Sequence, residues 1–424
     1  ASATTDPNAV QFAVTGIVAA NRNQLDDFVR DAGIFGRENF NYTQTEGRNT
    51  SGYLQTPQDP AGFGAGNWGG WFANLRNLVA LRPIIEAAAI PDPQKEAARG
   101  FARTIEGYEY LGAVLGRHNL GIPVEMLDDP LGIAPFVSRD SAYSLVVARL
   151  NDGATRLRAA GSAAFPFALH NGYVGFNTPA NFLRFNRALL ARVEAYRGSL
   201  GCGTACYQRA LTALGESFLD ASGPMTTGVY QAYSTAAGDA LNPITTFGGA
   251  LRVIVAHPSL ATDRPLRADG TPDNRFVAKT QTLTPAVNAP GTGIGIATSL
   301  GFRTYPNQDS PLPVIRNEEL ILLRAEARYF TGDVPGAVAD LNEVRVRSGG
   351  LAPITASQVA SRDDFVTELL LQRRLSLLQE GHRWVDVRRF GRLETLPLDL
   401  PTHVRALQQV IPQQECLNRR NTGN

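Results

Sequence analysis

The side chains that could carry catalysis or bind a metal are few in this chain and lie far apart. The chain has five histidines and three cysteines in 424 residues. The histidines are scattered, and none forms a ligand pair that would complete a zinc site with Cys202 and Cys206. His170, in HNGYVGFN, has no partner at a spacing that acid, base or nucleophilic catalysis would use. The pattern therefore predicts no metal, no cofactor and no catalytic residue.

Three further motifs resemble functional sites without matching one. The stretch GTGIGIATSLG is rich in glycine but is not followed by the lysine of a phosphate-binding loop. Asp269, Asp273 and Asn274 offer calcium-like oxygens, yet not at the spacing of a helix-loop-helix calcium site. Asp128 and Asp129 are adjacent, whereas the two carboxylates of a glycosidase flank the scissile bond from separate positions. An enzyme is therefore the least favoured class.

Aromatic residues in loops point instead to ligand binding. Capture of a sugar needs flat apolar faces and planar hydrogen-bonding side chains, held by loops on a rigid scaffold. The candidates come from GNWGGWF, NGYVGF and VYQAYS, and they are Trp68, Trp71, Tyr173, Phe176, Tyr230 and Tyr233. Trp68 is the strongest candidate because glycines and an asparagine bracket it. Burial in the core is the alternative for all six, since aromatic residues at helical spacing are usually buried.

Two of the three cysteines are close enough in sequence to form a bridge. Cys202 and Cys206 stand four residues apart in GCGTAC, and a helical turn or tight loop can place their Cα atoms within disulfide range. We predict a disulfide between them, and hence an oxidising compartment. Reduced thiols at all three cysteines remain the alternative. The sequence does not indicate the redox state of Cys416.

Composition and charge exclude some partners. Hydrophobic residues make up 43% of the chain, which is enough for a large core. A formal net charge of +1 gives no basic field of the kind that nucleic acid binding requires. The apolar runs are too short to span a membrane. The chain begins at Ala1 without the features of a signal peptide, so we expect any export signal to have been removed or to lie outside this sequence.

Most of the sequence has helical periodicity, broken by long loops rich in polar residues, glycine and proline. The first predicted helix begins at Asn23, with the stretch NQLDDFVRDAGIFG, and ends near Gly33. The other predicted helices span about 71–89, 92–117, 139–160, 179–198, 204–221, 317–331, 334–348, 362–380 and 383–391. Alternating strand patterns are scarce. The fold class predicted is all-α, with helices paired in sequence.

One helix pair has chemically explicit ends. Asn317 is expected to cap the helix over 317–331, and Gly332 to supply the left-handed residue that follows it. Asp333 is expected to cap the next helix. Two antiparallel helices joined by so abrupt a turn are typical of a tetratricopeptide repeat, although the usual tryptophan and proline are missing. Stacked pairs of this kind would form a short solenoid.

The segment over 222–312 differs from the rest of the chain. It is rich in glycine, proline, threonine and asparagine, and it is too long for a simple connector. We predict a loop-rich irregular subdomain with short helices near 225–235 and 246–256, packed on the helical array. The chain would then comprise N-terminal helical repeats over 1–221, this segment, and a C-terminal repeat with closing helices over 313–424, all in one compact unit.

The C-terminal third resembles the SusD/RagB family. PVIRNEELILLRAEARYFTGDVPGAVADLNEVRVRSGG is similar to the family segment in which an arginine precedes a helix ending in Ala-Glu-Ala, followed by Gly-Asp and a second helix. LLLQRRLSLLQEGHRWVDVRRFGRL is similar to the family's ending. Weaker similarity extends through most of the chain. In one departure, the Glu-Arg-Arg usual before the last turn is here Gln372, Arg373 and Arg374.

The resemblance implies a function as well as a fold. Family members are outer-membrane lipoproteins of Gram-negative bacteria that help TonB-dependent transporters capture nutrients. It therefore implies a cell-surface, non-enzymatic protein that binds an oligosaccharide or a peptide and acts as the lid of a SusC-like transporter barrel. The membrane anchor would be a lipid only, and the cysteine that carries it is absent from this numbering. A structural or assembly protein that self-associates through the same scaffold is the alternative.

The stretch EGHRWVDVRRFGRL is expected to stabilise the fold. We predict that Arg373, Arg374 and neighbouring arginines pair with carboxylates such as Asp386, and that Trp384 fills the last helical groove. The other carboxylates and arginines expected in this cluster are Glu326, Glu380, Arg383, Arg388 and Arg389. The alternative is an acid and base pair formed by His382 and Asp386, which is less favoured.

Overall fold

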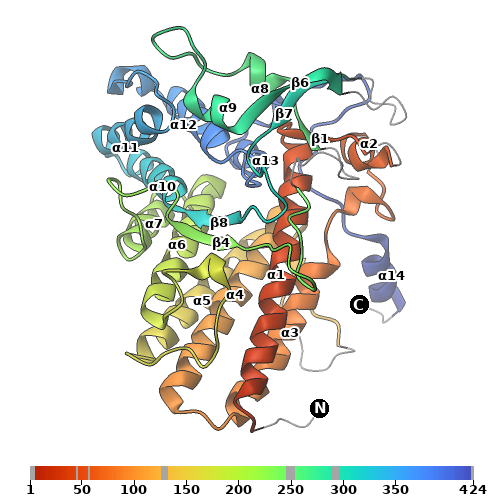
Figure 1. Cartoon of the computed structure of the whole chain (residues 1–424), viewed down its shortest axis with the longest axis vertical. Helices are drawn as coiled ribbons and strands as arrows, with labels where there is room; N and C mark the ends of the chain where they lie inside the picture. Colours follow the sequence, from red (N-terminus) through yellow and green to blue (C-terminus); the bar gives the residue numbers. More distant parts are fainter. Residues whose placement is uncertain are drawn as a thin grey trace.

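The computed structural model describes residues 5–43, 46–55, 58–125, 132–244, 254–287 and 296–421 (Figure 1). Its long helices are α1 (Asn8–Phe35), α3 (Gly69–Ala87), α4 (Asp92–Arg117), α5 (Arg139–Ala159), α6 (Pro179–Arg197), α7 (Thr204–Gly215), α10 (Asn317–Phe330), α11 (Val334–Arg347) and α12 (Arg362–Ser376). The shorter ones are α2 (Arg48–Leu54), α8 (Ser259–Thr262), α9 (Asn274–Lys279), α13 (Arg383–Arg389) and α14 (Gln413–Asn421). The prediction of a mostly helical fold is confirmed.

The helices pack as neighbours in sequence order. α4 lies against α5, α5 against α6, α6 against α7, and α10 against both α7 and α11 (Figure 1). α1 runs along α3 at the side of this array. Apolar side chains from α1 and α3 to α7 form the largest core cluster, and α10, α11 and α12 enclose a second one. The array of helical pairs is thus the rigid scaffold on which the loops are held.

The ends of the α10–α11 pair confirm two predictions and correct one. Gly332 has φ +95°, and the Asp333 carboxylate accepts a hydrogen bond from Gly336 N at 2.9 Å. Asn317 does not cap α10. Its buried side chain instead donates to Asp220 O at 2.6 Å and Pro224 O at 3.1 Å. Asn317 therefore fastens the loop before β4 to the array, because buried carbonyl groups need donors.

The described residues contain eight short strands. They are β1 (Asn39–Asn41), β2 (Ile122–Pro123), β3 (Phe136–Val137), β4 (Gly228–Gln231), β5 (Ile254–Ala256), β6 (Thr280–Val287), β7 (Thr298–Phe302) and β8 (Leu312–Arg316). Within the described ranges they form two-stranded antiparallel sheets, β1 with β5, β2 with β3, β4 with β8 and β6 with β7. The pairs β1–β5 and β4–β8 tie the predicted middle segment to the segments on both sides. The division at 221 and 312 stays a prediction.

Neither of the two helices predicted within the loop-rich segment is found in its described residues. Residues 228–231 form strand β4, whose alternating burial and pairing with β8 outweigh the weak helical periodicity of VYQAYS. Of the second predicted helix, residues 254–256 form β5, and residues 246–253 lie outside the described ranges. The N-terminal helix also differs from expectation, since it begins at Asn8 and ends at Phe35.

The C-terminal arginine cluster is buried and paired around Asp386. Its carboxylate accepts from Arg373 Nε at 2.7 Å and Arg389 Nε at 2.9 Å. Arg389 also donates to Glu326, at 2.7 Å through Nη2. Trp384 is fully buried, stacks on Phe35 of α1 at 4.5 Å between ring centroids, and so locks α13 to the N-terminal helix.

Other members of the cluster have partners different from those predicted. Arg374 pairs with Asp263 at 2.6 Å, and Glu380 pairs with Arg316 at 2.9 Å. Arg388 lies 3.6 Å from the centre of the Trp384 ring and donates to backbone carbonyl groups. Sequence distance could not reveal these partners, because they come from segments that only the fold brings together.

His382 does not form the alternative acid and base pair. Both carboxylate oxygens of Asp386 accept from arginines, while His382 Nδ1 lies 3.2 Å from Tyr196 Oη. Burial lowers the pKa of His382 to about 3, so its ring is neutral near pH 7. The geometry favours a structural role for both residues.

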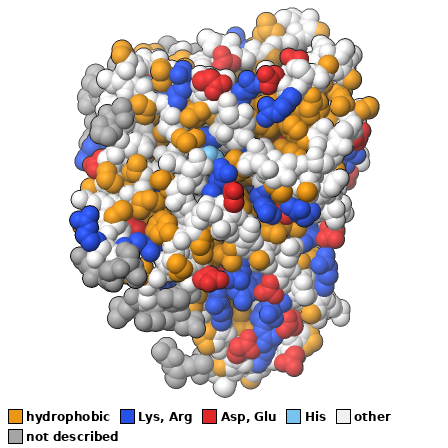
Figure 2. All heavy atoms as spheres, turned by 180° about the vertical axis from the view of Figure 1, so that it is seen from behind, with side chains coloured by type: hydrophobic (Ala, Val, Ile, Leu, Met, Phe, Trp, Pro, Cys, Tyr) orange, Lys and Arg blue, Asp and Glu red, His pale blue; other side chains and the backbone are white. Residues whose placement is uncertain are grey.

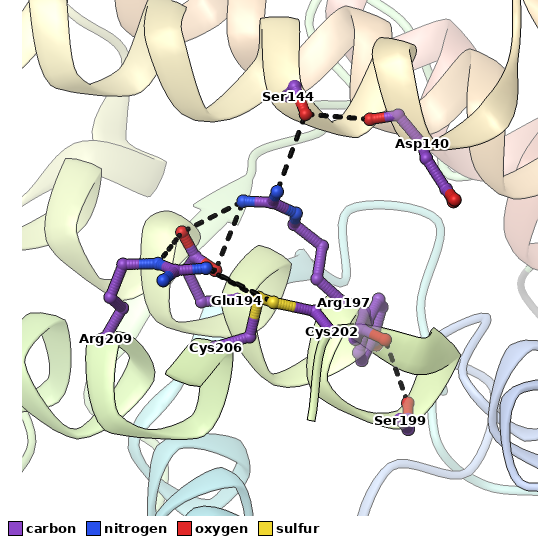
Figure 3. Close-up of a disulfide and its surroundings, with 9 residues drawn as sticks. Asp140, Ser144, Glu194, Arg197, Ser199, Cys202, Cys206 and Arg209 are labelled. Atoms are coloured by element: carbon purple, nitrogen blue, oxygen red, sulfur yellow. Dashed lines mark hydrogen bonds and ion pairs between the residues drawn. A yellow bond between two sulfur atoms is a disulfide. The ribbon is translucent and has the colours of Figure 1, made fainter. Parts of the chain in front are cut away.

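The structure joins Cys202 and Cys206 in a disulfide at the turn between α6 and α7 (Figure 3). The Cα atoms are 5.7 Å apart. Arg209 donates to Cys206 Sγ at 2.7 Å and pairs with the buried Glu194, which Arg197 also contacts at 3.2 Å. The bridge and these ion pairs together fix the reversal of the chain.

Removing this disulfide is expected to cost stability. Because the loop it closes is short, the Cys202→Ala/Cys206→Ala variant should lose about 2 kcal/mol in free energy of unfolding, chiefly through the larger entropy of its unfolded chain. Urea denaturation followed by circular dichroism measures the loss. Cys416→Ala, which removes the exposed free cysteine, is the control and should leave the midpoint unchanged. Equal midpoints for all three proteins would contradict the prediction.

Charged side chains of both signs are interspersed on the rear face of the molecule (Figure 2). Ion pairs such as Arg99 with Glu96, Arg103 with Asp152 and Arg149 with Glu106 join α4 and α5 or brace α4 itself. This dispersed pattern agrees with the formal net charge of +1. Among the described residues, no helix is both long enough and apolar enough to cross a bilayer.

Candidate functional site

A cleft beside Trp68 has a volume of about 930 Å³. We call it the Trp68 cleft. Its walls come from α1, α2, the loop before α3 and the start of α14, and include Asp27, Arg30, Arg48, Asn49, Tyr53, Phe63, Asn67, Trp68, Gln413 and Gln414. Planar polar side chains and aromatic rings therefore meet in one cleft, supplied by segments far apart in sequence.

Trp68 lines this cleft and is half-buried. Phe136 of β3 stacks on it at 6.1 Å between ring centroids, with planes 13° apart. The guanidinium of Arg117 lies 4.8 Å from the ring centre, and Trp68 Nε1 donates to Glu415 of α14 at 3.4 Å. These contacts occupy much of the ring surface that a ligand would need for stacking. Trp68 thus borders the cleft without offering the free platform expected from its glycine-rich surroundings.

Arg117 fixes the position of Trp68. It is almost fully buried, and its Nη2 donates to Ala65 O at 2.6 Å. Burial lowers the pKa of Arg117 to about 9, which means that its charge is costly at this position. Its cation–π contact with Trp68 and its bonds to the loop before α3 offset part of that cost. The back of the cleft is therefore rigid.

The open side of the cleft carries Arg48 and Phe63. The Arg48 side chain is 69% exposed, lies 5.2 Å from the centre of the Phe63 ring and pairs with Glu46 at 2.6 Å. An exposed ion pair of this kind is weak, so the guanidinium is available to a ligand. Arg30, which also lines the cleft, pairs with Asp27 at 2.8 Å and with the buried Asp31 at 2.9 Å. The cleft thus contains the guanidinium of Arg30, which two aspartates fix in place, and the guanidinium of Arg48, which a ligand can reach.

A second cavity, of about 690 Å³, holds three of the predicted aromatic residues. Phe176, Tyr230 and Tyr233 line it. We call it the Phe176 cavity. Its other named walls are Asn171, Gly172, Val174, Asn181, Arg184, Phe218, Asp220, Thr226, Thr227 and Asp309. It lies between the loop that precedes α6, the first turns of α6 and strand β4.

The two remaining aromatic candidates belong to the core. Trp71 is 3% exposed and packs edge-on against Phe28 of α1, and also against Gly112 of α4. Tyr173 is 1% exposed and packs against Phe182 and other aromatic residues of α6. The six candidates are therefore divided between two cavities and the core. A ligand role for them stays a prediction, and for Trp71 and Tyr173 the burial favours the packing alternative.

Sequence patterns did not indicate Arg48, Phe63, Asn67, Gln413 or Gln414. They come from α2, the loop before α3 and the first turn of α14, which are more than 300 residues apart at the extremes. No fixed spacing links them, so periodicity and motifs could not find them. The sequence feature that could have pointed to this site is GFGAGNWGGW, which combines glycines, an asparagine and aromatic residues in one loop.

The motifs set aside as non-functional lie mostly in ordinary turns. Asp269 accepts from Thr271 N at 3.0 Å, and Asp273 caps α9 through Arg275 N at 2.7 Å. Asp128, Asp129 and much of GTGIGIATSLG lie outside the described ranges. Within those ranges no group of three or more histidine, cysteine, aspartate or glutamate side chains could hold a metal ion.

One protein family and several solved structures resemble the chain. Residues 233–418 match the model of the SusD family. A SusD superfamily protein from Bacteroides vulgatus ATCC 8482 is 16% identical over 98% of each chain, with a TM-score of 0.70. One from Bacteroides thetaiotaomicron VPI-5482 is 17% identical over 98% of each chain, with a TM-score of 0.68. These likenesses extend the SusD-like fold over the full length.

A third solved structure is of a protein named for its ligand. It is a laminarin-binding SusD-like protein, 16% identical over 98% of each chain, with a TM-score of 0.68. No curated protein sequence matches the chain.

Proposed function

The chain belongs to the SusD/RagB family, whose members are non-catalytic binding proteins, and on that premise we propose that it captures glycans in the Trp68 cleft. The observation that carries the proposal is the meeting of planar polar groups with aromatic rings in an open cleft of about 930 Å³. Sugars present hydroxyl groups around apolar ring faces, so a site needs both kinds of contact. A laminarin-binding relative of the same fold supports this ligand class.

The rest of the role follows from the family. We propose that the protein lies on the cell surface of a Gram-negative outer membrane, held by a lipid, and closes over a SusC-like TonB-dependent transporter barrel. A rigid helical array with loops on one side suits a lid, because the array can move as a body while the loops hold the ligand. The family match at residues 233–418 supports the partnership.

Arg48 provides a direct test of the cleft. Its guanidinium is exposed at the cleft wall, and a hydrogen bond from a charged donor to a sugar hydroxyl contributes about 1.5–3 kcal/mol. We expect Arg48→Ala to weaken laminarin binding about tenfold or more in affinity electrophoresis. Arg362→Ala is a matched control, since Arg362 is also exposed, pairs with a neighbouring acid and lies over the Phe330 ring.

The outcomes separate the alternatives. Equal loss in both variants would indicate a general effect of charge. If laminarin and other neutral glycans fail to bind while peptides bind and Arg48→Ala weakens them, the cleft is a peptide site and the glycan proposal is wrong.

The proposed partnership predicts a stable complex in the native membrane. Purification of the protein from its own envelope in mild detergent should recover a barrel-sized transporter in equal amount, because a lid must stay attached to its barrel through each cycle. Mass spectrometry of the purified material identifies the partner. Recovery of copies of this chain alone would contradict the transporter role and favour self-assembly.

A further inference from the structure

The Phe176 cavity and the Trp68 cleft are separate sites. Their linings share no residue. Helix α1 lies between them, because Tyr233 Oη of the cavity is 3.5 Å from Asp26 of α1, while the next residue, Asp27, lines the cleft. A ligand in one cavity would therefore leave the other open, and each can be disabled without touching the other.

The wall formed by β4 and the residues after it is firmly held. β4 pairs with β8, with Gly228 opposite Arg316 and Gln231 opposite Leu312. Arg22 of α1 donates to Ala232 O at 3.0 Å, and its guanidinium lies 5.5 Å from the centre of the Tyr233 ring. This wall is thus positioned before any ligand arrives, which lowers the entropic cost of binding.

The opposite wall, the loop over 171–176, packs directly on β4. A Cβ atom at Gly172 would lie 1.9 Å from Tyr230 O, so only glycine allows this approach. His170 Nδ1 accepts from Gly172 N at 3.0 Å, and its Nε2 lies 3.3 Å from Gln231 Oε1. The loop is therefore anchored at its base, while the side chains of Asn171 and Val174 are exposed at the mouth of the cavity.

The chemistry of the lining combines an aromatic floor with a polar rim. Phe176 and Phe218 pack edge-on at 4.9 Å between centroids, and Tyr230 is half-buried beside them. The rim carries the side chains of Asn171, Asn181, Arg184, Thr226 and Thr227, which come from three separate segments. Amide, guanidinium and hydroxyl groups of this kind match the donors and acceptors of sugar hydroxyls.

Charge restricts the class of sugar. The side chains of the lining that carry a formal charge are Arg184, Asp220 and Asp309, which give a net charge of −1 when all three are ionised. Arg184 makes its described hydrogen bond to Ser217 O, at 3.3 Å, and so it is not neutralised by either aspartate through a described ion pair. A net negative lining repels anionic sugars and accepts neutral ones.

We propose that the Phe176 cavity is a second carbohydrate site, specific for neutral hexose units and independent of the Trp68 cleft. Two sites on opposite sides of α1 allow one chain to hold two ends of a polysaccharide, or two molecules of it. Such bivalent contact increases retention of a long ligand without any new contact in either site. The proposal does not require that the cleft bind the same sugar.

Hydrogen exchange of the full chain tests the two sites separately. The probes are the neutral trisaccharides laminaritriose, cellotriose and maltotriose, and the acidic trigalacturonic acid. We expect at least one neutral trisaccharide to protect the segments 171–176 and 224–233. Thr227→Trp, which fills the mouth of the cavity, should abolish that protection and leave any protection of 46–69 intact. Thr155→Trp, at an exposed threonine of α5, is the matched control.

Each outcome has one meaning for the proposal. Protection of 46–69 alone would overturn the second site and leave the cleft proposal standing. Protection of 171–176 alone would support the second site and contradict the cleft, and protection of neither would overturn both. Protection of 171–176 by trigalacturonic acid would overturn the restriction to neutral sugars. Asn181→Ala should also weaken the protection, which keeps the test valid if Thr227→Trp does not fold.

Discussion

Asp386→Asn is expected to destabilise the protein by about 3–5 kcal/mol, because it leaves the buried cation of Arg373 without an ionic partner. Asp386 is 2% exposed, and its carboxylate binds Arg373 at 2.7 Å and Arg389 at 2.9 Å. Burial alone would raise the pKa of Asp386, but the two arginines outweigh it and hold that pKa below its usual range. Arg389 keeps Glu326 in the variant, whereas Arg373 has no second described ion pair.

Asp363→Asn is the matched control for this prediction. Asp363 also pairs with an arginine, Arg392, at 2.7 Å, but its side chain is 69% exposed. Solvent screens such a pair, so its loss should cost less than about 1 kcal/mol. Urea denaturation followed by circular dichroism gives both values. Similar losses in the two variants would mean that burial of the Asp386 pair adds nothing to its energy.

The helical scaffold was largely predictable because its signals are local. The helix predicted over 92–117 is α4, and the turn between α10 and α11 is marked by Gly332 and by the cap of Asp333. In both places the residues that define the end of a helix lie close to that end in the sequence. Apolar periodicity and capping then suffice, since neither depends on distant contacts.

Features that depend on distant partners were not predictable in this way. β4 is a strand because β8 pairs with it, and of its four residues Val229 and Tyr230 are of types that favour strands. Asn317 was expected to cap a helix but serves a loop almost 100 residues earlier in the chain. Trp68 was identified as a site residue, yet the contacts of Arg117 and Phe136 that restrict its ring come from other elements. Residue type and local sequence identify a candidate residue, whereas its tertiary contacts determine its role.

In the candidate site, too, the sequence identified residues within single motifs but not the partners that come from distant segments. Six aromatic residues from three sequence motifs were identified as candidates, and four of them line the Trp68 cleft or the Phe176 cavity. Their division between two cavities follows from the path of α1, which passes between them. The polar partners in the Trp68 cleft, including Gln413 and Gln414, come from the far end of the chain. An aromatic motif in sequence thus indicates the type of ligand better than it indicates the number of sites.

Buried glutamates create a pH dependence of stability that the sequence does not reveal. Glu109 of α4 is fully buried, and its Oε1 accepts from Asn21 at 2.7 Å and Asn74 at 2.5 Å. Its Oε2 has no partner among the described residues. Burial raises the pKa of Glu109 from 4.5 to about 8, and the two amides oppose this only in part.

The sign of the effect follows from proton binding. Between about pH 4.5 and pH 8 the folded state holds a proton on Glu109 that the unfolded state has released. Stability contributed by this group is therefore fully present below pH 4.5 and is lost as the pH rises towards 8. At about 1.4 kcal/mol for each pH unit, the loss over this window is on the order of 5 kcal/mol. Glu38, whose pKa burial raises to about 7, acts in the same direction.

Glu109→Gln should remove the Glu109 part of this loss, because glutamine keeps the shape of the neutral acid and cannot ionise. We expect the variant to have the wild-type free energy of unfolding near about pH 4.5 and to exceed it by several kcal/mol near about pH 8. Urea denaturation across this range measures the difference between the two curves. Glu216→Gln, at an exposed glutamate after α7, should follow the wild type throughout. A Glu109→Gln curve parallel to the wild type would mean that the buried carboxyl ionises without penalty, and that a water molecule satisfies its open oxygen.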